Sequence, residues 1–179
     1  MDVALISAAA GKSFNYFGML AAKDYWFDST IKRTLTNFVM NLVPIARKTE
    51  ERNGDTFTFD DTIELCRAFM DQEGRNLVIF PEGSRGEPNM MRPFRKGAAR
   101  FSVHLNAPIV PIFIDGSFRS WPKGRFIMYP ACVNVKILPP IHPSDFVTEE
   151  DSNHYEQINQ MTKTLEGQIQ QERKSFYAG

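Results

Sequence analysis

Apolar residues recur along this chain with helical spacing in some segments and as short runs in others. Short apolar runs predict strands at residues 14–22, 43–47, 77–79, 109–114 and 133–138. Apolar or helically spaced segments predict helices over residues 3–10, 29–42, 61–74, 97–105 and 155–177. This alternation is typical of an α/β fold with a mainly parallel or mixed sheet covered by helices.

Caps and breakers refine these elements. Asp2 is placed to cap the first turn of the first helix, and Asp61 has capping-box spacing at the start of another, with Gly74 closing it. Pro111 predicts a strand edge, a bulge or a strand end. The polar segments predict loops, a mobile one at 48–59 and a second at 117–130.

Length and charge limit the possible functions. The 179 residues suffice for one domain with one core, so we expect a single domain over 1–179. Lys plus Arg and Asp plus Glu balance at 21 each, which argues against a nucleic-acid-binding protein. Cys66 and Cys132 lack metal-ligand spacing and are interpreted as reduced thiols of a cytosolic setting. No apolar run is long enough to predict a membrane span.

The segment from Phe80 to Gly86 is the strongest candidate for chemistry. It follows the apolar run 77–79, at the end of a predicted buried strand, where α/β proteins bind ligands. Pro81 ends the strand and Gly83 lets the backbone turn, which carries a carboxylate and a guanidinium out of the sheet. The simpler interpretation is a turn whose Glu82 and Arg85 form a surface pair that contributes about 0–1 kcal/mol.

Three spaced motifs point to a family. The sequences Phe-Pro-Glu-Gly-Ser-Arg at 80–85, Phe-Arg-Lys-Gly-Ala-Ala-Arg at 94–100 and Pro-Ile-Val-Pro at 108–111 occur in order. Together they resemble the glycerolipid acyltransferases, the family of lysophosphatidic acid acyltransferase. The resemblance implies transfer of a fatty acyl group from acyl-CoA or acyl carrier protein to the hydroxyl of a lysophospholipid. It implies no metal and no prosthetic cofactor, and a peripheral location on the cytoplasmic face of a membrane.

The same resemblance assigns roles to residues. Asp2 is the orienting acid of a catalytic His-Asp pair, and Lys96 assists electrostatically. Arg47, which follows Ala46 where the family usually has Asp, lies near the acceptor's phosphate. The implied acceptor-binding residues are Arg47, Glu82, Gly83, Ser84 and Arg85, with Lys96 beside them.

The His of that pair is the main departure from the family pattern. It would stand five residues before Asp2, which is before residue 1, so we expect either an N-terminally truncated domain or a variant without its base. His104, His142 and His154 have no Asp five positions later and are interpreted as surface or loop residues. A chain without the base should turn over poorly.

A cluster of cations surrounds the motif segment. Between residues 85 and 100 the only acid is Glu87, against the cations Arg85, Arg92, Arg95, Lys96 and Arg100. Such a cluster suits a phosphorylated lipid, coenzyme A, acyl carrier protein or an anionic membrane surface. A non-catalytic module that binds anionic lipid or acyl-CoA is therefore the alternative function. Gly11-Lys12-Ser13 is not a phosphate loop, since Ile6 stands where that motif needs Gly.

Overall fold

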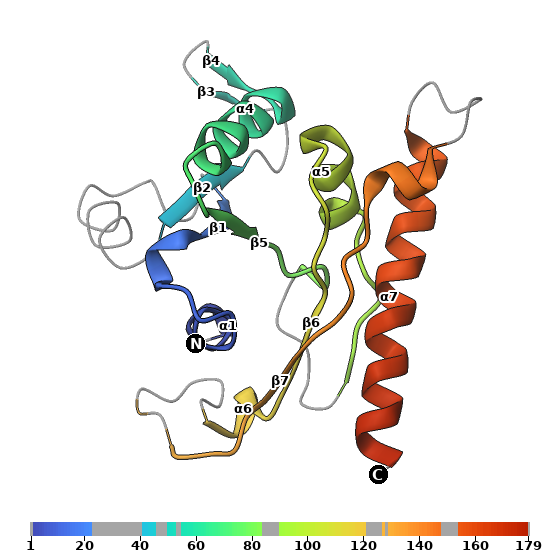
Figure 1. Cartoon of the computed structure of the whole chain (residues 1–179). Coiled ribbons are helices and arrows are strands. Elements are labelled where there is room, and N and C mark those ends of the chain that lie inside the picture. The colour runs from blue at the N-terminus through green and yellow to red at the C-terminus, as the bar shows by residue number, and fades with distance from the viewer. Residues whose placement is uncertain are drawn as a thin grey trace. The chain divides into compact units, whose positions relative to one another are not determined.

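The computed structural model describes residues 2–22, 41–45, 50–52, 55–83, 90–120, 127, 129–147 and 154–178. The chain divides into two compact units. One comprises Ala10–Ile79, and the other comprises Met1–Ala9 together with Phe80–Gly179. Figure 1 shows their elements. The expectation of one domain over all 179 residues stays a prediction.

The unit Ala10–Ile79 contains a parallel sheet. Its central strand β1 (Phe17–Ala22) pairs in parallel with β2 (Asn41–Ile45) on one side and β5 (Asn76–Val78) on the other. Phe17 and Val43 are buried. Parallel strands need crossover connections, usually helical, so this sheet confirms the predicted α/β class. Pro44 lies on the edge strand β2, where its missing N–H is tolerated.

Helix α4 (Phe59–Met70) lies against β2 and β5 of this sheet. Its N-cap is Thr58: the Thr58 hydroxyl accepts from the Asp61 amide at 3.2 Å, and the Asp61 carboxylate accepts from the Thr58 amide at 2.6 Å. The capping box therefore lies three residues earlier than predicted, because Asp61 serves as its acidic partner and not as its cap. The helix ends at Met70, and Gly74 (φ +75°) lies in the turn beyond.

Two predictions in this unit were wrong. The segment expected as a mobile loop contains β3 (Glu50–Arg52) and β4 (Asp55–Phe57), paired antiparallel. Its polar composition favoured a loop, but backbone pairing tolerates polar side chains, and Asn-Gly between two short strands is a hairpin signal. Leu42, the expected end of the helix at 29–42, belongs to β2. The rest of that helix lies outside the described residues, apart from Asn41, which is also in β2.

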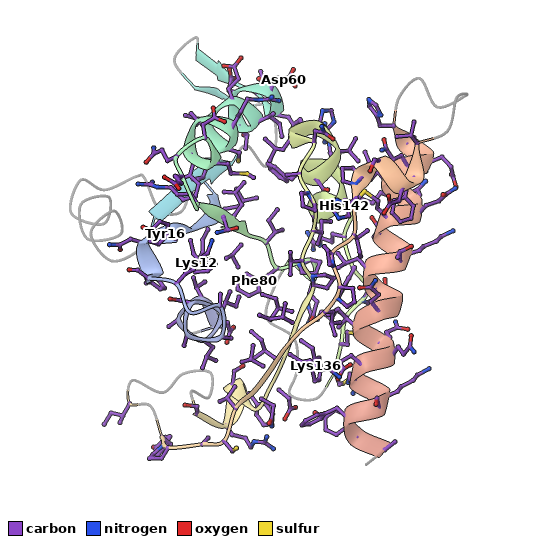
Figure 2. The ribbon with its side chains drawn as sticks, in the orientation of Figure 1. Lys12, Tyr16, Asp60, Phe80, Lys136 and His142 are labelled. Carbon is purple, nitrogen blue, oxygen red and sulfur yellow. The ribbon has the colours of Figure 1, made fainter. Side chains whose placement is uncertain are left out.

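The strand expected from Phe14 begins at Phe17. Residues Phe14–Tyr16 instead form a 3₁₀ turn, η1, closed by the Tyr16 amide donating to Ser13. Lys12 and Tyr16, both labelled in Figure 2, lie in the segment that leads into β1. Lys12 Nζ donates to the carbonyl of Gly74 at 3.4 Å, so the lysine of the rejected phosphate-loop match contacts the turn after α4.

The second unit is built around helix α7 (Tyr155–Ala178), the helix expected over 155–177. Helix α5 (Gly97–Leu105) and strand β6 (Ile112–Asp115) lie against it, as Figure 1 shows. The apolar residues that recur at helical spacing along α7 are mostly buried: Ile158, Met161 and Leu165 are buried, and Ile169 is half-buried.

Strand β6 pairs antiparallel with β7 (Asn134–Ile137) in a separate two-stranded sheet. β6 begins directly after Pro111, and only an isolated bridge between Ile109 and Ile141 precedes it. Pro111 therefore marks a strand end, one of the alternatives that the sequence left open. Lys136 on β7, which is labelled in Figure 2, pairs with Glu172 of α7 at 2.7 Å.

Shorter elements complete this unit: α1 (Asp2–Ala9), α6 (Ser117–Ser120) and the 3₁₀ helix η2 (Pro143–Phe146). The first four residues of the loop expected over 117–130 form α6. They do so because the Arg119 amide donates to Gly116 and the Arg119 guanidinium pairs back to Asp115.

Both cysteines are free thiols; Cys66 is buried and Cys132 is exposed.

Candidate functional site

A tight turn follows β5, as the sequence predicted. The amide of Gly83 donates to the carbonyl of Phe80 at 3.0 Å, and Gly83 has φ +71°. Pro81 and Glu82 at the corner of the turn are half-buried. We call residues 80–83 the acidic turn. Ser84 and Arg85, the next two residues of the motif, lie outside the described residues.

The acidic turn is held by the segment 90–96, which we call the bridge segment. The Glu82 carboxylate accepts a hydrogen bond from the Arg92 amide at 3.3 Å. The Arg95 amide donates to the Pro81 carbonyl at 2.8 Å. Two parts of the predicted motif series, around residues 80 and 94, are therefore joined by one backbone–backbone hydrogen bond and one bond from a backbone amide to a carboxylate.

Glycine is required at position 83 for two reasons: the backbone conformation there, and the lack of room for a side chain. L residues with a side chain rarely adopt its φ of +71°. A Cβ at this position would lie 2.8 Å from Cδ and 2.9 Å from Nε of Arg95. The Arg95 side chain thus packs directly on the turn. The sequence placed Arg95 in the motif at 94–100 and in the cation cluster, but no local pattern indicated its contact with Gly83.

Lys96 contacts helix α7. Its ammonium lies 4.3 Å from the centre of the Tyr155 ring, a cation–π contact. A hydrogen bond from Asn159, followed by hydrogen bonding and attraction from Lys96, lowers the pKa of Tyr155. Among the described residues, Lys96 therefore contacts the first turn of α7. The assignment of Lys96 to substrate binding stays a prediction.

Helix α5 begins directly after the bridge segment. Ala98, Ala99 and Phe101 are buried, so the small side chains allow this helix to pack closely, and it lies against α7. Residues on the other side are polar. The cations of the cluster that the structure describes are all exposed: Arg92, Arg95, Lys96 and Arg100.

Asp2 is the first residue of α1 and is half-buried. The helix is anchored by Val3 and Ile6, which are buried, and it lies against β7. A carboxylate in the first turn interacts favourably with the helix dipole. Among the described residues, no hydrogen bond or ion pair joins Asp2 to the acidic turn. Arg47 lies outside the described residues, just beyond β2.

All three histidines are exposed, in agreement with their interpretation as surface or loop residues. His104 on α5 and His154 before α7 lie with their ring centres 6.2 Å apart. Nδ1 of His154 is hydrogen-bonded to the side chain of Gln157 at 2.9 Å. His142 precedes η2. None of the three belongs to the acidic turn or the bridge segment.

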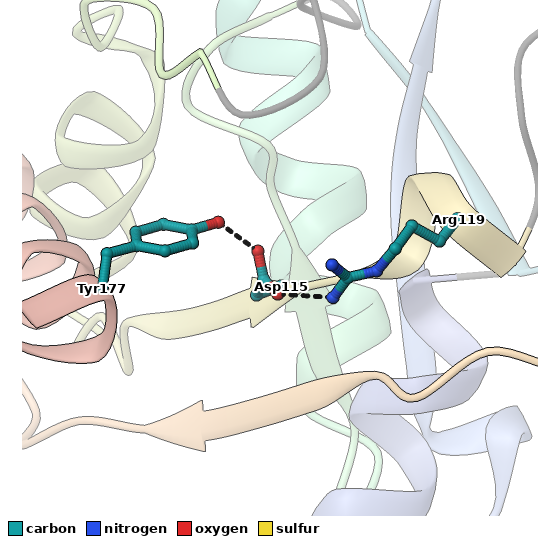
Figure 3. A network of polar contacts seen from close by, with 3 residues as sticks. All are labelled: Asp115, Arg119 and Tyr177. Atoms are coloured by element: carbon teal, nitrogen blue, oxygen red, sulfur yellow. Dashed lines mark hydrogen bonds and ion pairs between the residues drawn. The ribbon is translucent and has the colours of Figure 1, made fainter. Parts of the chain in front are cut away.

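A second polar cluster was not predicted from the sequence. Asp115, at the end of β6, is buried; its carboxylate accepts from the Tyr177 hydroxyl and pairs with Arg119 at 2.9 Å (Figure 3). The hydrogen bond to Asp115 and burial raise the pKa of Tyr177. The cluster fastens the last turn of α7 to β6. The only signal of this cluster in the sequence was a charged residue directly after the apolar run 112–114.

The described helices include none that is both long and apolar enough to cross a membrane. Among the described residues, no group of three or more potential ligands is arranged to hold a metal ion.

Comparison with known proteins identifies related sequences. The chain is 32% identical over 88 residues to a 1-acyl-sn-glycerol-3-phosphate acyltransferase of Limnanthes douglasii, covering 49% of this chain and 31% of that protein. It is 32% identical over 105 residues to the enzyme of that name from Cocos nucifera, covering 59% and 33%. It is 31% identical over 109 residues to the alpha form from Mus musculus, covering 60% and 36%. The chain thus spans about a third of the length of these relatives.

A solved structure and a family model extend the comparison. The crystal structure of the 1-acyl-sn-glycerophosphate (LPA) acyltransferase PlsC from Thermotoga maritima matches with a TM-score of 0.62 at 21% identity, covering 92% of this chain and 58% of that one. This similarity shows the fold. The model of the family described as Acyltransferase matches residues 1–115, a range that includes both Asp2 and the acidic turn. The chain therefore belongs to the Acyltransferase family.

Proposed function

We propose that this chain carries the acyl-transfer domain of an enzyme that esterifies lysophosphatidic acid. The observation that carries the proposal is the acidic turn, in which Glu82 and Gly83 are held by the bridge segment. This turn lies inside the range matched by the family. The names of the related proteins, 1-acyl-sn-glycerol-3-phosphate acyltransferases, support the choice of acceptor.

The acceptor's phosphate and glycerol are assigned to the acidic turn and its neighbours. A guanidinium fork matches phosphate oxygens, and a carboxylate accepts from a hydroxyl. Arg85 binds the phosphate, while Glu82 accepts from a glycerol hydroxyl. Gly83 lets the backbone approach the acceptor, Ser84 is assigned to the same binding segment, and Lys96 adds positive charge.

The reaction needs a base for the acceptor hydroxyl. A His five residues before Asp2 would take the hydroxyl proton, while the Asp2 carboxylate orients the imidazole and stabilises its protonated form. The acceptor oxygen then forms an ester bond with the acyl carbon, and the carbon–sulfur bond of the thioester breaks. The thiolate leaves and receives the proton back from the imidazolium, so no external proton source is needed.

We assign the acyl donor to the surface formed by the cation cluster. Arg92, Arg95 and Arg100 are exposed, and they suit the phosphates of coenzyme A or the acidic face of acyl carrier protein. The same positive surface suits an anionic membrane, where both the acceptor and the product reside. We therefore propose a peripheral position on a membrane surface.

The residues of this chain supply Asp2 but no His five residues before it. Because a positioned base contributes about 10²–10⁴ in rate, we propose that the chain as given turns over slowly. Restoring the base is therefore part of the test. We call the extended chain the version with residues added before Met1 so that a His stands five positions before Asp2.

The test is acyl transfer by the extended chain from labelled acyl-CoA or acyl carrier protein to lysophosphatidic acid. The expected result is phosphatidic acid with release of the free thiol carrier, and an Asp2→Asn variant slower by up to about 10⁴. If no product forms with either donor while lysophosphatidic acid still binds, and Arg85→Ala abolishes that binding, the non-catalytic lipid-binding module is the correct function.

A further inference from the structure

The bridge segment connects the acidic turn to helix α7 through backbone amides. On one side, the Arg92 and Arg95 amides donate to the Glu82 carboxylate and the Pro81 carbonyl, at 3.3 and 2.8 Å. On the other side, the Phe94 amide donates to the carboxylate of Glu166 on α7 at 3.2 Å. Two adjacent amides, those of Phe94 and Arg95, therefore hold two different parts of the unit.

Both carboxylate oxygens of Glu166 are engaged. Oε2 accepts from the Phe94 amide, and Oε1 accepts from the side chain of Gln170 at 3.0 Å, one turn further along α7. Glu166 is half-buried. A carboxylate bonded at both oxygens has little rotational freedom, and bonds to an ionised acceptor are stronger than neutral ones. The position of the Phe94 amide is thereby set by a rigid helix.

The helix that carries Glu166 is itself well anchored. Met161 and Leu165 of α7 are buried, and the Gln157 side chain donates to the Pro143 carbonyl at 2.7 Å. At the end of the bridge segment, Lys96 contacts the Tyr155 ring of the same helix at 4.3 Å. The bridge segment therefore contacts α7 at two points. One is the contact of Lys96 with Tyr155, and the other is the hydrogen bond to Glu166 from Phe94, which lies two residues after Arg92.

We propose that Glu166 is a positioning residue for acceptor binding. It fixes the Phe94 amide and hence the bridge segment, and the bridge segment in turn orients the Glu82 carboxylate. The inference rests on the proposed function, since Glu82 is assigned there to the acceptor. Removing the Glu166 carboxylate should leave α7 folded but allow the acidic turn to sample orientations that bind the acceptor poorly.

The chain offers a matched control on the same helix. Glu156 accepts from the Gln160 side chain at 3.1 Å with the same four-residue spacing, and it is exposed. Glu156→Ala removes the same kind of intrahelical bond as Glu166→Ala, without an effect on the Phe94 amide. Glu166→Gln is the conservative rescue, because its side-chain oxygen can still accept from that amide.

The first readout is amide hydrogen exchange in the chain as given, which needs no turnover. Glu166→Ala should speed exchange at Phe94 and also at Arg92 by about tenfold or more, because the two bonds share one segment. Glu166→Gln and Glu156→Ala should leave exchange at Arg92 within about twofold. Exchange at Arg92 that is the same in Glu166→Ala and Glu156→Ala would overturn the proposal.

The second readout is acyl transfer by the extended chain. Glu166→Ala should raise the KM for lysophosphatidic acid by about tenfold while the KM for acyl-CoA stays within about twofold, with recovery in Glu166→Gln. A purely structural role would change both KM values together, and that result would refute the inference while leaving the proposed function intact. If the unmutated extended chain neither binds nor acylates lysophosphatidic acid, the proposed function fails, and the acceptor role of Glu166 fails with it.

Discussion

The carboxylate of Glu82 is bonded to the backbone amide of Arg92, with 3.3 Å between Oε2 and N. Among the described residues, the main chain of the bridge segment therefore orients the acidic side chain. A carboxylate that must meet a substrate hydroxyl in one geometry benefits from such a fixed partner.

Substitution of Glu82 should separate this hydrogen bond from the charge. In the extended chain, Glu82→Ala loses the acceptor for the Arg92 amide, and we expect kcat/KM for lysophosphatidic acid to fall by about 10–100-fold. Glu82→Gln keeps an oxygen acceptor and should lose less. Steady-state kinetics with varied acceptor measures both, and equal losses in the two variants would show that the bond to Arg92 does not matter.

Replacement of Gly83 should destabilise the unit that contains it. In Gly83→Ala the new Cβ would lie 2.8 Å from the Arg95 side chain, on a backbone with φ +71°. We expect the free energy of unfolding to fall by at least about 1–2 kcal/mol, measured by urea denaturation. Gly97→Ala is the control: a Cβ there meets no heavy atom within 4 Å, so that variant should be neutral or slightly stabilising. Similar losses in both variants would contradict this account of Gly83.

The buried thiol of Cys66 should make stability depend on alkaline pH. Burial raises its pKa from 9.0 to about 11. Well below pH 9 the thiol is protonated in both the folded and unfolded states, so this group adds no pH dependence there. Between pH 9 and 11 the unfolded chain releases the proton while the folded chain keeps it. The free energy of unfolding should therefore fall by about 2–3 kcal/mol.

The Cys66 contribution is isolated by comparison with Cys66→Ala, in which every other group still titrates. The difference in unfolding free energy between the two proteins should shrink as the pH rises from 8 to about 11. A difference that stays constant over this range would mean that the thiol does not titrate as proposed.

Loss of the Tyr177 hydroxyl should loosen the end of α7. Tyr177→Phe removes a donor to the buried Asp115 carboxylate, which keeps its pair with Arg119. Water can partly replace the hydroxyl because Tyr177 is 52% exposed, so we expect a loss of about 1 kcal/mol. Tyr129→Phe, whose hydroxyl makes no hydrogen bond to a described residue, should change stability by less than about 0.5 kcal/mol. Chemical denaturation that ranks the two variants in the opposite order would contradict the role of Tyr177.

Local sequence patterns predicted those elements that are determined by residues only a few positions apart. The run 77–79, Pro81 and Gly83 specified a strand followed by a turn, and the structure has β5, the turn and a positive φ at Gly83. The long helix α7 followed from the spacing of its buried stripe. The capping box was misplaced because Thr58 and Asp61 both suit a cap, and only the hydrogen bonds distinguish them.

Features that depend on long-range contacts were not predictable from spacing. The Phe94 amide meets Glu166 across 72 positions of sequence, and Tyr177 meets Asp115 across 62. Neither pair has a local pattern that would reveal it. The hairpin of β3 and β4 was missed for another reason: its polar strands carry no apolar alternation, so only the Asn-Gly pair indicated a turn.

The central claim is that this chain is an acyl-transfer domain whose turnover needs a His paired with Asp2. The most direct measurement is the rate of acyl transfer from acyl-CoA to lysophosphatidic acid by the extended chain, compared with the chain as given. We expect the extended chain to be faster by about 10²–10⁴. Equal rates from the two chains would contradict the account.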